Sequence, residues 1–227
     1  MVRNEVKFSE YKKHINEGDI LLFRGTNLIS KFIRSSSETP YSHVGVASWI
    51  NGKANTNEGI LECVEFREGS LLAGLFGFPG GGGGRSVNLK QQVKKYSGLI
   101  DVYRVSPIFF SYKLNDNKEI ILSEKAFDGK SVTTIMRQMT GLPYGWRRVW
   151  WMFKHKLLCY RLSSDYQSIT DDNLNDIVYP VCSTALSYAH NVNGFDLVNN
   201  RNDEWTEPGD IAKSSQTHYL FTLKCDE

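Results

Sequence analysis

The clearest pattern in the chain is an alternation of apolar and polar or small residues between residues 41 and 50. Such a period of two predicts a β-strand with two different faces. One face would carry Val44, Val46 and Ile50, and the other His43, Gly45, Ala47 and Trp49. The second face is unusual because its histidine stands among mostly small neighbours, which leave room for an imidazole.

Similar short apolar runs, each ended by a glycine, proline or polar turn, predict further strands at 19–25, 60–67, 99–105 and 219–223. Apolar residues at helical spacing predict helices at 5–17, 26–37, 88–96, 130–140 and from about 180 to 190. The strand, turn and strand order around Asn51-Gly52 favours an antiparallel meander. At 227 residues, one domain spanning the chain is the default expectation.

Two segments carry other signals. Leucine and phenylalanine residues precede Pro79 and five consecutive glycines, Gly80 to Gly84. A phosphate-binding P-loop would need Lys-Ser or Lys-Thr after its last glycine, but Arg85-Ser86 follows, so we expect a mobile flap over about 70–86. Between 108 and 128 the pattern is weak, and it suggests an extra hairpin near residues 115–117.

The segment 147–156 mixes arginine and lysine with tryptophan and phenylalanine. On a helix this composition suits a membrane interface, which would allow peripheral membrane contact. A buried helix with a solvated basic edge gives the same pattern, so both interpretations stay open.

Composition narrows the possible functions. The chain is 41% hydrophobic and 23% charged, which is ordinary for a globular protein, and its net charge of +2 does not favour nucleic acid as a partner. Neither an apolar secretory segment nor a membrane-spanning run is present, which predicts a protein that starts out soluble and cytoplasmic. The four cysteines are far apart, without the spacing of a zinc site, and we expect free thiols.

Cys182 is the candidate nucleophile. Pro180 stands just before a predicted helix, so Cys182 falls at or next to the helix start, where unpaired N–H groups and a partial positive charge favour a thiolate. The simpler alternative is a buried cysteine that only packs.

A nucleophilic cysteine needs a base, and the base needs a polar residue that orients it. His43 fits the base because of its small neighbours, whereas His190 would lie about 12 Å from Cys182 along the same helix. For the orienting residue, Glu62 shares a strand face with apolar residues and would need a partner. Glu65 points to the opposite face and suits a solvated charge near Arg67.

Seven short blocks, in the same order, resemble the circularly permuted branch of the NlpC-type papain-like superfamily, most of all its YiiX/YebB-like group and more distantly lecithin:retinol acyltransferase. The blocks are Gly18–Phe23, Tyr41–Val46, Ile60–Glu62, Tyr103–Val105, Gly141–Tyr144, Val181–Ser183 and Pro208–Asp210.

This resemblance implies an α+β fold in which a small antiparallel sheet or barrel carries the base and the nucleophile's helix packs against it. It maps the nucleophile to Cys182, the base to His43 and the orienting residue to Glu62. It also places Tyr41 and Tyr144 near the cleft as substrate-binding residues, and it implies neither a metal nor another cofactor.

The sequence therefore predicts a cysteine hydrolase of amide bonds, with cell-wall peptides as the leading substrate class. A second hypothesis is a thioesterase, lipase or acyltransferase that acts on lipid acyl groups, and a third is a binding module without catalysis.

Overall fold

The structure is a computed structural model that describes residues 3–25, 39–56, 58–69, 82–114, 120–146, 180–199 and 201–226. Its strands are β1 (Glu5–Lys7), β2 (Ile20–Arg24), β3 (His43–Ile50), β4 (Ile60–Glu68), β5 (Gly82–Asn88), β6 (Leu99–Val105), β7 (Ile108–Leu114), β8 (Ile120–Ala126) and β9 (Thr217–Lys224). The helices are α1 (Phe8–Tyr11), α4 (Leu89–Lys95), α5 (Gly129–Gln138), α7 (Cys182–Val192) and α8 (Pro208–Lys213), with short 3₁₀ helices at Lys12–His14 and Asp203–Trp205.

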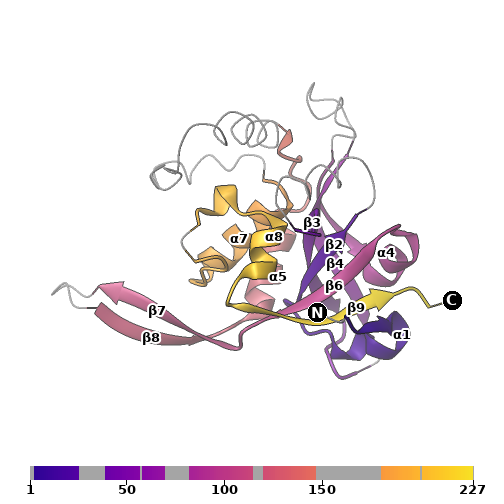
Figure 1. The fold of residues 1–227 in the computed structure, drawn as a ribbon, viewed down its shortest axis with the longest axis horizontal. Helices are drawn as coiled ribbons and strands as arrows, with labels where there is room; N and C mark the ends of the chain where they lie inside the picture. Colours follow the sequence, from indigo (N-terminus) through magenta and orange to yellow (C-terminus); the bar gives the residue numbers. More distant parts are fainter. Residues whose placement is uncertain are drawn as a thin grey trace.

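Seven strands form one sheet in the order β1-β9-β6-β2-β3-β4-β5. All neighbours are antiparallel except β1 and β9. Strands β2, β3 and β4 form the predicted meander, and β5 extends it by one strand that was not predicted. Helices α5, α7 and α8 gather on one side of this sheet, and α4 lies on the other side (Figure 1). The predicted α+β fold is therefore confirmed.

Both faces of the sheet are covered by apolar residues, as the period of two requires. One core joins alternate strand residues to α5 and α7, and includes Ile20, Leu22, Val44, Val46, Val64, Phe66, Met136, Cys182 and Leu186. The other core joins the intervening strand residues to α4, and includes Leu21, Phe23, Ala47, Leu61, Cys63, Leu89 and Val93.

The hairpin expected between 108 and 128 exists as the separate two-stranded sheet of β7 and β8, which projects away from the rest of the protein (Figure 1). The helix predicted at 5–17 is wrong in its first part, because residues 5–7 form β1 and pair in parallel with β9. The predicted helix at 26–37 and the basic aromatic segment at 147–156 lie outside the described residues. Within the described ranges, no helix has the length and apolar character needed to cross a bilayer.

The glycine run is partly a strand. Residues 70–81 lie outside the description, but Gly82, Gly83 and Gly84 begin β5 and pair with the end of β4, so the predicted flap is wrong for that part. Glycine is required because another segment crosses closely: a Cβ on Gly84 would lie 2.5 Å from the carbonyl oxygen of Met139. The Gly84 N–H also donates to the Leu142 carbonyl oxygen at 2.9 Å.

Candidate active site

Cys182 is the first residue of α7, as predicted. The preceding residue, Val181, is extended and caps the helix, with its N–H donating to the Thr184 hydroxyl at 2.9 Å. At this position the thiol stands beside the N–H groups of the first helical turn, which carry a partial positive charge. Cys182 is only 5% exposed, and together with Cys63 and Cys225 it is a free thiol; Cys159 lies outside the described residues.

His43 is the first residue of β3, so its ring stands at the end of the strand. The ring Nε2 lies 2.7 Å from Glu65 Oε2, and we assign the proton of this hydrogen bond to Nε2 because an ionised carboxylate can only accept. The other nitrogen, Nδ1, is buried and has no hydrogen-bonding nitrogen or oxygen partner among the described residues. Because Nε2 is taken, Nδ1 is the nitrogen left to face the Cys182 thiol.

The electrostatics of His43 bring these groups together. Burial disfavours the charged imidazolium, but the charges of Glu65 and Cys182 and hydrogen bonds to both outweigh it, and the pKa of His43 is raised. Because a side-chain hydrogen bond to Cys182 is one of these causes, the sulfur lies next to the imidazole. The structure therefore brings the predicted nucleophile and the predicted base into one site.

Glu65 holds the imidazole from the other side. Its side chain is fully buried, and Arg85 donates to Oε1 from Nε at 2.9 Å and from Nη2 at 2.6 Å. Gln92 Nε2 donates to Oε2 at 2.9 Å. Burial alone would raise the pKa of Glu65, but the charge and hydrogen bond of His43, followed by the charges of Arg85 and Arg67, lower it.

The prediction that Glu62 orients His43 is wrong. Glu62 lies opposite Ser48 in the β3–β4 register, on the other face of the sheet from His43. There it pairs with Arg137 Nη1 of α5 at 2.9 Å and accepts a hydrogen bond from Ser86. Glu62 did need a partner, but the partner is an arginine that docks α5 on the sheet.

Gly45 explains how Glu65 reaches His43. In the register, Gly45 lies directly opposite Glu65, on the same face as His43. A Cβ on Gly45 would lie 2.6 Å from Cys63 Sγ and 3.1 Å from Glu65 Cβ. The small residue predicted to leave room for an imidazole thus leaves room for the carboxylate that binds it.

Tyr144 lies beside the thiol. Burial raises the pKa of Tyr144 well above its usual value, and the charge of Cys182 and a side-chain hydrogen bond to it raise it further. The backbone fixes this position, since the Tyr144 N–H donates to the Gly82 carbonyl oxygen at 3.1 Å and the Gly145 N–H donates to that of Pro180 at 3.2 Å. The glycine strand β5 therefore positions a tyrosine at the site.

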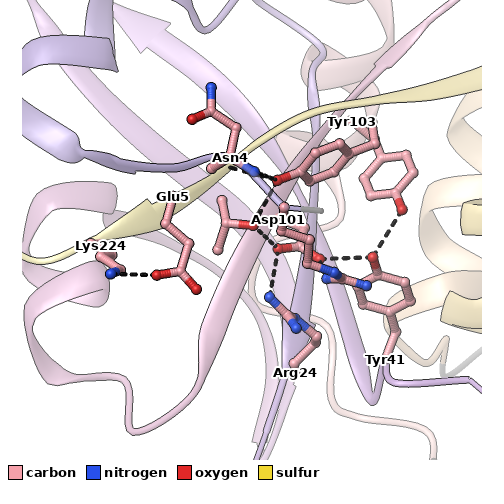
Figure 2. A network of polar contacts seen from close by, with 10 residues as sticks. Asn4, Glu5, Arg24, Tyr41, Asp101, Tyr103 and Lys224 are labelled. Carbon is pink, nitrogen blue, oxygen red and sulfur yellow. Dashed lines mark hydrogen bonds and ion pairs between the residues drawn. The ribbon is translucent and has the colours of Figure 1, made fainter. Parts of the chain in front are cut away.

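Tyr41 has a different environment from the one predicted. Its ring is buried, and its hydroxyl donates to Asp101 Oδ2 at 2.8 Å and lies 2.9 Å from the Tyr103 hydroxyl (Figure 2). Asp101 is also bound by Arg24 at 3.1 Å. This network ties β2 and β6 to the segment just before β3. It also occupies the Tyr41 hydroxyl, which was expected to bind substrate.

Arg85 and Gln92 complete the site, and no local sequence pattern points to either of them. Both act through Glu65, so finding them required the correct carboxylate first. Among the described residues, no group of three or more histidine, cysteine, aspartate or glutamate side chains has an arrangement that could hold a metal ion.

The fold and this site define an α+β protein in which a helix-tip thiol faces a histidine and a glutamate on an antiparallel sheet. Among solved structures, the chain resembles the metalloprotein YiiX from Escherichia coli O157:H7, with a TM-score of 0.52 and 14% sequence identity over 91% of this chain and 96% of that one. At this identity the likeness shows a YiiX-like fold. Neither a family model nor a curated protein matches the chain.

Proposed function

We propose that the protein is a cysteine hydrolase that cleaves amide bonds through Cys182, His43 and Glu65. The observation that carries this proposal is the position of His43, held by Glu65 through Nε2 while Nδ1 remains for the sulfur. A neutral structural histidine would need no buried carboxylate that is itself supported by an arginine and a glutamine. The arrangement suits an imidazolium that pairs with a thiolate.

In the first half of the reaction, the Cys182 thiolate attacks the substrate carbonyl carbon and a C–S bond forms. The His43 imidazolium donates its Nδ1 proton to the leaving nitrogen as the C–N bond breaks, which leaves a thioester on Cys182 and a neutral imidazole. In the second half, His43 takes a proton from water, the resulting hydroxide attacks the thioester, and the C–S bond breaks. The acid product leaves, and the thiolate and imidazolium are restored.

The negative oxygen formed in each attack needs hydrogen-bond donors. The backbone N–H of Cys182 lies in the first turn of α7 and supplies one. The Tyr144 hydroxyl, beside the same sulfur, is the second donor that we assign. Its raised pKa keeps it protonated, as a donor must be.

The order of these residues supports the circularly permuted NlpC-type relationship. His43 and Glu65 lie on early strands of the sheet, and Cys182 follows them on a late helix, the reverse of the order in papain itself. In this proposal the three residues fill the roles of nucleophile, base and orienting residue in that reversed order.

YiiX is described as a metalloprotein, which raises the question of a metal here. The acceptor positions at the site do not fit one: Glu65 already accepts from an arginine, a glutamine and the histidine, and Cys63 also donates to it at 3.8 Å. We therefore derive no step through a metal.

The experiment is to trap the acyl-enzyme. The full chain is mixed with a cell-wall-type peptide amide and, in a separate reaction, with a fatty acyl ester. Each reaction is quenched in acid and digested, and mass spectrometry measures the mass of the peptide that contains Cys182. We expect an acyl adduct on Cys182 with the peptide, release of the amine product, and loss of both in Cys182→Ala.

If an adduct formed only with the fatty acyl ester, the proposed substrate class would change from peptide amides to lipid acyl groups. Product release that persists in Cys182→Ala, or an adduct on Cys225 alone, would exclude the proposed nucleophile. The Glu62→Gln variant is the matched control, since it removes a carboxylate from the other face of β4 and should retain the adduct.

A further inference from the structure

A second site lies next to the candidate active site, between α4 and the ends of β4 and β5. It is a cavity of about 450 Å³, and its lining residues are Arg67, Glu68, Arg85, Val87, Asn88, Gln91, Gln92, Lys95 and Tyr96. This volume falls in the range of small-molecule sites, roughly 300–1,000 Å³. The proposed hydrolysis uses none of these side chains except Arg85 and Gln92, which act indirectly through Glu65.

The strand pairing explains why cations meet there. Arg85 lies opposite Glu65, and Arg67 lies opposite Gly83, so both arginines project from the face that α4 covers. From α4, Lys95 approaches one turn after Gln91, so three cations reach one cavity from three elements.

The charges are only partly neutralised. Arg67 lies 3.6 Å from Glu68, and Arg85 binds the buried Glu65 behind the cavity. No ion pair involving Lys95 occurs among the described residues. The Arg85 side chain remains 48% exposed, and its Nη1 makes none of the hydrogen bonds to Glu65. The cavity therefore retains an excess of positive charge and guanidinium donors.

The cavity also has an apolar wall. The Arg67 guanidinium lies 5.5 Å from the centre of the Tyr96 ring, and Val87 lines the same space. A ring stacked against an arginine presents a flat surface beside a cationic one. This combination suits a ligand that has an acidic group attached to a small flat or apolar body.

We propose that this cavity binds a small organic anion, a molecule with a carboxylate or phosphate group on a short apolar or aromatic body. Arg67, Arg85 and Lys95 contact the acidic group, and Tyr96 and Val87 contact the body. Arg85 contacts the ligand with one side of its guanidinium and Glu65 with the other. Only Arg85 therefore separates the ligand from the carboxylate that holds His43.

The test uses the full chain labelled with ¹⁵N and three probes: benzoate, phenyl phosphate and the neutral benzyl alcohol. We expect saturable shifts of the Arg67 and Arg85 Nε–H signals and the Gln92 side-chain amide with at least one anion, and none with benzyl alcohol. The anion that binds more tightly identifies the acidic group. Lys95→Gln and Arg67→Gln should each weaken binding by about three- to fivefold, the range of a partly exposed ion pair.

Lys94→Gln is the matched control, because Lys94 is the exposed neighbour on the same helix and does not line the cavity. The Lys94→Gln variant should bind the anions with the same affinity as the unmodified protein. Equal weakening by Lys94→Gln and Lys95→Gln would indicate a diffuse charge effect and overturn the proposal. Binding of benzyl alcohol as tight as that of the anions, or shifts that never saturate, would overturn it as well.

Discussion

Glu65→Gln tests the electrostatic basis of the candidate site, because it removes one charge while nearly preserving shape. The glutamine oxygen can still accept from His43 Nε2, which lies 2.7 Å from the present carboxylate. What is lost is the attraction between carboxylate and imidazolium. For unit charges about 4 Å apart at an effective dielectric constant of about 20, this attraction is about 4 kcal/mol. Hydrogen bonds to charged groups measured in proteins contribute less, about 1.5–3 kcal/mol.

These values predict that the pKa of His43 falls by about 1 to 3 units in Glu65→Gln, since one unit corresponds to 1.36 kcal/mol. The assay is an NMR titration of the His43 imidazole in the full chain. The variant should also lose stability near neutral pH. In the unmodified protein, the raised pKa of His43 gives stability that disappears as the pH rises through that pKa. The lowered pKa of Glu65 gives stability that disappears as the pH falls through it.

Glu62→Gln is the control for this prediction. Glu62 pairs with Arg137 on the opposite face, so its variant should leave the His43 titration unchanged and lose at most about 1 kcal/mol of stability, the range of a partly exposed ion pair. If Glu65→Gln left the pKa of His43 within a few tenths of a unit, or if Glu62→Gln shifted it more, our assignment of the orienting carboxylate would be refuted.

Three further variants test other parts of the account. Gly84→Ala brings a Cβ to 2.5 Å from the Met139 carbonyl oxygen, so it should cost about 1–3 kcal/mol of stability and slow acylation of Cys182 by on the order of tenfold; an unchanged rate would contradict the positioning role of β5. Tyr41→Phe removes buried hydrogen bonds and should cost about 1–3 kcal/mol by urea unfolding while acylation of Cys182 stays intact. Burial lowers the pKa of His190 to about 4, so stability should fall by up to about 3 kcal/mol as the pH drops from neutral to 4, and His190→Gln should flatten that dependence.

The fold was accessible from the sequence because its strands alternate cleanly. In β3 the period of two separates Val44 and Val46 from His43 and Gly45, and the structure places these sets on opposite faces. Segments whose structure depends on distant partners were less predictable. Residues 5–7 form β1 because they pair with the edge strand β9, and the local sequence of residues 5–7 does not indicate this pairing.

The candidate site could be predicted only in part, because some of its contacts also depend on distant partners. The helix start at Cys182 and the strand start at His43 follow from local signals, and the structure brings the two together. The choice between Glu62 and Glu65 depends on the β3–β4 register, which local patterns do not determine. The expectation that Glu65 is a solvated charge near Arg67 is wrong, because Glu65 is fully buried and binds His43, whereas Glu62 binds Arg137.

The glycine run shows a further limit. A series of glycines is compatible with a flexible loop, and equally with a backbone that another segment must approach closely. The second explanation holds for Gly82 to Gly84, because residues 139–144 cross directly against them. Only the crossing segment reveals which explanation applies, and it lies more than fifty residues further along the chain.

The pairing of the Cys182 thiolate with the His43 imidazolium is tested most directly by the rate of alkylation with iodoacetamide as a function of pH, resolved by mass spectrometry for each cysteine. We predict that Cys182, although only 5% exposed, reacts faster than the exposed Cys225 in mildly acidic solution, and that this advantage disappears in His43→Ala. A Cys182 that reacts more slowly than Cys225 at every pH, or whose reactivity does not depend on His43, would contradict the account.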